Sequence, residues 1–264
     1  MIRRRPSAAL APFVETLWAS SADATGRIER VLPTGAMHLV VRLGASPLAI
    51  YDDAGERIVR TLGPMVLGGA RSSFYVRDVS KPTRSIGAQL RPGASMALFG
   101  VPADRLAETH TDLADLWPAV GELRDRLGEA PSLAEGLAIF ESFLVRRLAG
   151  RAPLPAMIAA SLARLRRDAR VPISTLVRES GASHRGFLSL FRASVGLSPA
   201  TYRRVVRAER ALALLGGSES LASVAAMAGY ADQAHCTREL VAIAGITPSR
   251  LRRAGAPSHH VKMG

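Results

Sequence analysis

The sequence predicts an α+β protein, with a β-rich N-terminal domain followed by an all-α C-terminal domain. Short runs rich in β-branched and aromatic residues occupy the first ninety residues, and helical periodicity replaces them after Pro92. A segment rich in glycine and proline, residues 150–155, then interrupts the helical pattern. We therefore expect domains at residues 1–153 and 154–256, followed by a short C-terminal tail at residues 257–264.

The N-terminal domain is expected to be a small antiparallel sandwich or barrel with trailing helices. Turn-forming residues such as Pro33-Thr34-Gly35 separate short strands, a spacing typical of these folds. The expected strands are residues 37–43, 48–51, 65–68, 73–77 and 85–90. A helix over residues 132–149 is expected because apolar side chains recur at helical spacing, at Leu133, Leu137, Phe140, Leu144 and Leu148.

The positive charge of the chain is concentrated in its C-terminal part. Residues 154–264 contain 16 Lys or Arg against 6 Asp or Glu, whereas residues 1–153 contain 19 against 16. Such an asymmetry is typical of a domain that meets a polyanion. The single cysteine, Cys236, excludes an intramolecular disulfide and suits a cytoplasmic protein. No run of about 20 apolar residues is present, so we expect no membrane partner.

One pattern of glycines, helix starts and prolines occurs twice in the C-terminal part. The two copies are Gly181, Ser183, Gly196 and Pro199, and then Gly229, Asp232, Gly245 and Pro248. A short amphipathic helix precedes the first glycine of each copy. Helix, tight glycine turn and capped helix make up a helix-turn-helix unit, whose second helix enters the major groove of DNA. Two copies in a strongly basic region predict double-stranded DNA as the partner.

A continuous helix is expected between the two copies. It begins at Pro199 and stops before Gly216-Gly217, which gives 17 residues over 199–215. At ~1.5 Å per residue such a helix spans roughly 25 Å. A rigid connector of this length is suited to placing two recognition helices about 34 Å apart, which is one turn of B-DNA.

Besides the repeated spacing, the C-terminal part contains several short stretches whose residue identities match those of known regulators. They are Ser180-Gly181-Ala182-Ser183, Gly196-Leu197-Ser198-Pro199 and, most specifically, Ala228-Gly229-Tyr230-Ala231-Asp232-Gln233-Ala234-His235. Together they resemble the DNA-binding domain of the AraC/XylS family over about residues 157–253. The resemblance implies a bacterial transcription regulator that binds promoter DNA and is not an enzyme. Two departures concern single DNA contacts: Ser189 stands where the family often has Arg, and Leu240-Val241-Ala242 replaces an aromatic residue followed by basic ones.

The N-terminal domain resembles the variable sensor half of such regulators, which is often cupin-like. The resemblance implies a small-molecule effector or a homodimer formed through this domain. Two alternatives stay open, namely a purely dimerising module and an enzyme such as a DNA-repair alkyl acceptor or a hydrolase. An enzyme needs a nucleophile with its base, yet residues 1–153 contain no cysteine and no Gly-x-Ser-x-Gly motif. We expect no cofactor and no metal, because His38 and His110 are the only histidines of this domain.

The candidate DNA-binding residues lie on the outward faces of the two recognition helices and on the connector. The first recognition helix supplies Ser183, His184, Arg185, Leu188, Ser189 and Arg192. The second supplies Gln233, Ala234, Thr237 and Arg238, and the connector supplies Arg203 and Arg204.

Individual roles follow from the chemistry of these side chains. Arg185 and Arg238 suit guanine O6 and N7, and Gln233 suits adenine. Contacts to phosphate are the alternative for each of them, because half or more of protein–DNA hydrogen bonds go to phosphate and sugar. Leu188 either touches a thymine methyl or packs against a neighbouring helix. The connector arginines either contact phosphates or form ion pairs within the domain.

Overall fold

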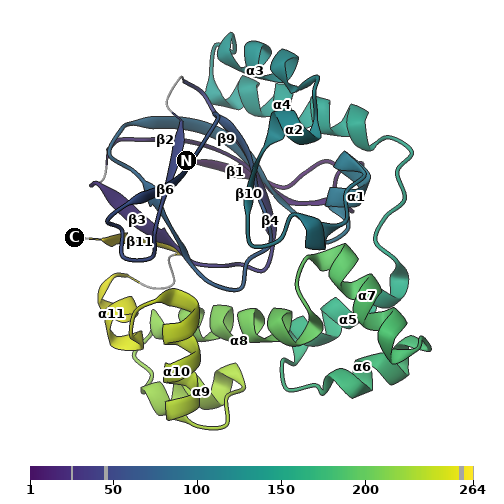
Figure 1. Ribbon diagram of the computed structural model, residues 1–264, viewed down its shortest axis with the longest axis vertical. Helices are drawn as coiled ribbons and strands as arrows, with labels where there is room; N and C mark the ends of the chain where they lie inside the picture. Colours follow the sequence, from purple (N-terminus) through teal and green to yellow (C-terminus); the bar gives the residue numbers. More distant parts are fainter. Residues whose placement is uncertain (25, 45–46, 256–258, 264) are drawn as a thin grey trace.

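The computed structural model describes residues 1–24, 26–44, 47–255 and 259–263. It confirms the α+β class: two antiparallel sheets form the N-terminal part and helices form the C-terminal part (Figure 1). Residues 256–258 and 264, at the end of the expected second domain and in the expected tail, lie outside the described residues. Within the described part, none of the helices combines the length and the apolar character needed to span a bilayer.

Two sheets make up the N-terminal sandwich. In order across the first sheet, the strands are β1 (Ile2–Arg4), β2 (Val14–Ala22), β9 (Thr83–Leu90), β4 (Met37–Arg42), β7 (Met65–Gly68) and β10 (His110–Asp112). The second sheet contains β11 (His260–Met263), β3 (Ile28–Val31), β8 (Tyr75–Asp78), β5 (Leu48–Tyr51) and β6 (Ile58–Leu62). The five strands expected from the sequence are β4, β5, β7, β8 and β9. The other six were not predicted, because polar and charged residues interrupt their apolar patterns.

The first sheet packs one face on helices and turns the other toward the second sheet. Along β4, Leu39 and Val41 are fully buried, whereas His38 and Arg42 alternate with them and lie between the sheets. The packed face is covered by α1 (Ala94–Phe99), α2 (Leu113–Leu116), α3 (Val120–Gly128) and α4 (Leu133–Leu148). Helix α4 confirms the helix expected over residues 132–149, and the Ser132 hydroxyl caps it by accepting from the Glu135 N–H at 3.2 Å.

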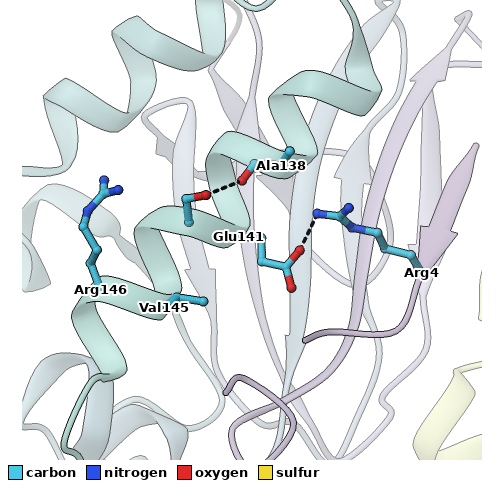
Figure 2. Close-up of a pocket in the computed structure, with 6 residues that line it drawn as sticks. Arg4, Ala138, Glu141, Val145 and Arg146 are labelled. Atoms are coloured by element: carbon cyan, nitrogen blue, oxygen red, sulfur yellow. Dashed lines mark hydrogen bonds and ion pairs between the residues drawn. The ribbon is translucent and has the colours of Figure 1, made fainter. Parts of the chain in front are cut away.

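The N-terminal strand β1 is fastened to α4 by polar contacts. The Arg4 guanidinium donates to the Leu137 carbonyl at 3.3 Å and forms an ion pair with Glu141 (Figure 2). The Ser7 N–H donates to the other Glu141 oxygen at 2.8 Å. Arg4 and Glu141 also lie at the wall of a surface hollow. The residues that line this hollow are Arg4, Ala138, Glu141, Ser142, Val145 and Arg146. The polar contacts hold the edge strand against the helix layer.

Seven helices follow residue 155 within the described part of the chain. They are α5 (Ala156–Arg167), α6 (Ile173–Ser180), α7 (His184–Val195), α8 (Pro199–Leu215), α9 (Leu221–Ala228), α10 (Gln233–Ala244) and α11 (Pro248–Arg253). The expected connector over residues 199–215 is α8. In Figure 1 it runs between α5–α7 at one end and α9–α11 at the other. Two helix-turn-helix units joined by a long helix are therefore confirmed.

The hydrophobic core does not divide at residues 150–155. One buried cluster contains the first sheet and α1–α4 together with Ile158, Phe187, Phe191 and Tyr202 of the C-terminal part. The Tyr202 ring lies so close to Gly35 that a Cβ at this glycine would be 3.2 Å from it. A second cluster surrounds α9 and α10 and includes Leu32 of the N-terminal part. Each helix-turn-helix unit therefore buries apolar side chains against the sandwich.

The end of the chain returns to the sandwich as strand β11. It pairs with β3 in a register that places His260 opposite Val31, and the Leu32 N–H donates to the His259 carbonyl at 2.8 Å. Glu29 of β3 lies 3.0 Å from His260 Nδ1 and accepts from Arg77 Nε at 2.6 Å. Burial alone would raise the pKa of Glu29, but these two partners outweigh it and lower the pKa to about 2. Part of the expected tail is thus an edge strand, attached to the sandwich by hydrogen bonds and by Glu29.

Candidate nucleic-acid interface

The first helix-turn-helix unit consists of α6, a glycine turn and α7. Helix α6 ends at Gly181, whose φ of 68° lies in the left-handed region that glycine adopts without strain. The Ser183 hydroxyl then caps α7 by accepting from the Gly186 N–H at 3.1 Å. Phe187 and Phe191 are fully buried, with ring centroids 5.9 Å apart. Their burial fixes which face of α7 points outward.

The second unit repeats this construction with α9 and α10. Helix α9 ends at Gly229, with a φ of 92°, and the Asp232 carboxylate caps α10 by accepting from the His235 N–H at 2.7 Å. Cys236 and Leu240 are fully buried at the positions that Phe187 and Phe191 occupy in the first unit. Burial, together with the charge of Glu239, raises the pKa of the Cys236 thiol to about 11. Cys236 is therefore a neutral packing residue.

The outward faces of α7 and α10 carry the candidate base-reading residues. The exposed ones in the first unit are Ser183, His184, Arg185, Ser189 and Arg192. In the second unit Gln233, Ala234 and Arg238 are exposed, and Thr237 is partly buried. Leu188 is also partly buried and packs against the core, in line with the packing alternative. Both helices thus present an open polar face over their N-terminal halves.

The connector arginines are bound within the protein. Arg204 Nε lies 2.8 Å from Glu239 Oε1, and Arg207 Nη2 lies 2.9 Å from both Glu239 oxygens. Arg203 Nη1 donates to the Val171 carbonyl at 3.2 Å, and Arg210 donates to the carbonyl of Arg166. The structure therefore places Arg203 and Arg204, the two candidate phosphate contacts, in interactions within the C-terminal part.

Glu239 is a buried charged residue whose role in positioning the second recognition helix the sequence did not predict. Its side chain is only 7 % exposed and links α10 to α8 through Arg204 and Arg207. Arg207 also stacks on the Tyr230 ring, with its guanidinium carbon 5.0 Å from the ring centroid. The signal was an acidic residue three positions after Cys236, on the otherwise apolar inward face of the helix. This cluster holds the second recognition helix against the connector.

A direct link between the two units was also missed. Arg170, in the loop before α6, donates to the Ala226 carbonyl of α9 at 2.5 Å. Its side chain also lies against Gly229, so that a Cβ there would be 3.4 Å from Arg170 Cγ. The glycine turn of the second unit therefore contacts the loop that leads into the first unit. Within the described residues, no three His, Cys, Asp or Glu side chains form a group suited to a metal ion.

Comparison with known proteins matches the two parts of the chain to separate domain families. Residues 176–254 match a helix-turn-helix domain family, and residues 2–112 match a family described as "Domain of unknown function (DUF6597)". No curated protein matches the chain.

Two solved structures of ToxT from Vibrio cholerae share the fold of the chain. One is 10% identical with a TM-score of 0.50, covering 90% of this chain and 98% of that chain. The other, solved with (E)-4-(8-methylnaphthalen-1-yl)but-3-enoic acid bound, is 9% identical with a TM-score of 0.50, covering 90% and 99%. The likeness therefore extends over the sandwich and both helix-turn-helix units.

Replacing Glu239 tests whether this carboxylate holds α10 in place. Glu239→Gln leaves the partly buried Arg207 without its counter-charge, so we expect a loss of about 3 kcal/mol in the free energy of unfolding. Urea denaturation of the full chain measures this loss. Glu179→Gln is the control, because Glu179 lies 3.9 Å from Arg164 in an exposed pair that contributes at most about 1 kcal/mol. Equal losses in the two variants would show that the cluster does not hold α10.

Proposed function

We propose that the chain is an AraC/XylS-type DNA-binding transcription regulator, and that it reads two promoter half-sites under the control of an anionic effector bound in its sandwich. AraC-type regulators are not enzymes. The observation that carries the proposal is the open N-terminal half of both α7 and α10, each beginning at a capped helix end. Homodimerisation and a cytoplasmic location stay predictions.

Base reading is assigned to the exposed residues of the two recognition helices. In helix-turn-helix proteins the N-terminal residues of the second helix contact base edges. Arg185 and Arg238 are exposed on these faces, and both guanidiniums suit bidentate bonds to guanine. Arg192 lies two turns further along α7 and suits a phosphate contact. Because Arg204 is engaged with Glu239, we assign its main role to holding α10 rather than to DNA.

The connector sets the expected distance between half-sites. Helix α8 has 17 residues and so spans roughly 25 Å. Half-sites read on one face of the duplex lie about 34–36 Å apart, or 10–10.5 base pairs. We therefore propose two half-sites centred about 10–11 base pairs apart.

Charge between the two sheets supports an anionic effector. Arg42 of β4 and Arg77 of β8 both lie between the sheets, and burial together with the charge of Arg77 lowers the pKa of Arg42. Glu29 pairs with Arg77, whereas Arg42 donates to the Pro47 carbonyl at 3.0 Å and forms no ion pair within the described residues. The charge of Asp78 partly offsets that of Arg77, and a carboxylate placed here would give Arg42 a direct ion-pair partner.

The histidines of the same space remain neutral at physiological pH. Burial lowers the pKa of His38 to about 4 and that of His110 to about 3, with smaller effects from neighbouring charges. His110 packs edge-on against Tyr75 with ring centroids 4.4 Å apart, and His38 Nε2 lies 2.9 Å from the Thr34 hydroxyl. These rings therefore offer apolar surface and hydrogen bonds beside the arginines. ToxT, which shares the fold, has been solved with a carboxylic acid bound.

Arg185→Ala and Arg238→Ala test the assignment of base readers. Each is expected to cost roughly 1–3 kcal/mol of binding free energy and to relax base preference within one half-site. Selection from a random DNA pool at fixed salt, followed by affinity measurement, reports both effects. Arg124→Ala on α3 is the control, because it removes the same charge from an exposed site in the N-terminal helices. Unchanged base preference in both recognition-helix variants would refute the assignment.

Melting with a defined carboxylate tests the effector class. A ligand that binds only the folded state at a hundred times its Kd stabilises by about 2.7 kcal/mol. We expect decanoate to raise the melting temperature and uncharged decanol to leave it unchanged. Arg42→Gln is expected to abolish the shift. Arg84→Gln, an exposed change on the opposite face of the same sheet, is expected to keep it. Equal stabilisation by decanol and decanoate, or no shift with decanoate, would contradict an anionic effector.

A further inference from the structure

The N-terminal part holds both recognition helices at equivalent positions. The Gly93 N–H donates to the Ser194 carbonyl of α7 at 2.8 Å, and the Phe74 N–H donates to the Ile243 carbonyl of α10 at 2.8 Å. Ser194 and Ile243 each lie two residues before the glycine that ends their helix, so they correspond in the duplicated pattern. Both helices are therefore held by their C-terminal ends, and their N-terminal ends stay open.

The glycines that end the two helices are packed against the same loop. At Gly196 a Cβ would lie 3.1 Å from the Ala70 Cβ and 3.2 Å from the Ala103 carbonyl oxygen. At Gly245 a Cβ would lie 2.4 Å from the Phe74 ring. Ala70 and Phe74 belong to residues 69–74, which connect β7 to β8 and are called the bridging loop below. They are four residues apart, so the two contacts are separated by at most about 14 Å of chain.

Glu108 holds the bridging loop in place through hydrogen bonds. Arg71 donates to the Glu108 carbonyl at 2.8 Å, the Ser72 N–H donates to the Glu108 carboxylate at 2.9 Å, and the Glu108 N–H donates to the Ala70 carbonyl at 3.0 Å. Glu108 itself has a φ of 58°, a left-handed conformation that residues other than glycine rarely adopt. Gly69 lies so close to the Leu106 carbonyl that a side chain has no room there. These contacts make the loop a rigid element.

We propose that the bridging loop fixes the position of one recognition helix relative to the other, and so determines which half-site spacing the protein accepts. The proposal rests on the proposed reading of two half-sites. Helix α8 and the Arg170–Ala226 contact connect the units at their sides, whereas the loop connects the ends of the recognition helices themselves. Phe74 and Ala70 are positioning residues, because they contact the helices and not the DNA.

Affinity for duplexes of varied spacing tests the proposal. The probe is the DNA site selected by the full chain, with the spacing between its half-sites changed one base pair at a time. For the wild type we expect one optimal spacing, with binding about tenfold weaker (1.4 kcal/mol) two base pairs away from it. For Phe74→Ala, and for insertion of one glycine between Ser73 and Phe74, we expect a flatter or displaced spacing profile. Base preference within each half-site is expected to stay unchanged.

Two controls separate positioning from general destabilisation. Leu133→Ala removes a partly buried side chain from the N-terminal helices and is expected to keep the wild-type spacing profile. Phe74→Leu retains an apolar contact with Gly245 and is expected to restore much of the optimum. A wild-type optimum that both bridging-loop variants keep would overturn this proposal alone, even if their overall affinity changed. If the wild-type protein binds all spacings equally well, both this proposal and the proposed reading of two half-sites would be overturned.

Discussion

Two backbone hydrogen bonds from the sandwich, at Ser194 and Ile243, define how the recognition helices are presented. Because each bond holds a helix at its C-terminal end, the N-terminal halves that carry Arg185 and Arg238 remain open to solvent. The glycines that follow these carbonyls are also packed against the N-terminal part: a side chain at Gly245 would collide with Phe74, and one at Gly196 would lie in tight contact with Ala70. The N-terminal part therefore supports both helix-turn-helix units and not only one of them.

Packing extends this constraint through the whole molecule. The first unit shares its core with the first sheet, through Phe187, Phe191 and Tyr202, and the second unit packs on Leu32. The bridging loop enters from β7 of one sheet and leaves as β8 of the other, and β8 carries Tyr75 and Arg77 into the space between the sheets. A ligand in that space would thus act on the strands that flank the loop. Under the proposed function, this arrangement would give effector binding a short physical route to the recognition helices.

The sequence predicted those features whose physical cause is local. Helix caps at Ser183 and Asp232, left-handed glycines at Gly181 and Gly229, and the 17-residue connector all follow from short-range patterns, and the structure contains each of them. Features that depend on distant residues were missed. Glu239 and Arg170 gain their roles only when α8, α9 and α10 come together, and β11 becomes a strand only because the β3 edge is free to pair. The shared core was also missed, because apolar residues that seal an interface have the same helical spacing as those inside one domain.

Hydroxyl-radical footprinting of the full chain on its selected DNA site measures most directly whether the two recognition helices act as a pair. We expect two protected regions on one face of the duplex, centred about 10–11 base pairs apart, with Arg185→Ala and Arg238→Ala each weakening a different one. A single protected region, weakened to the same extent by both variants, would show that α7 and α10 do not read separate half-sites.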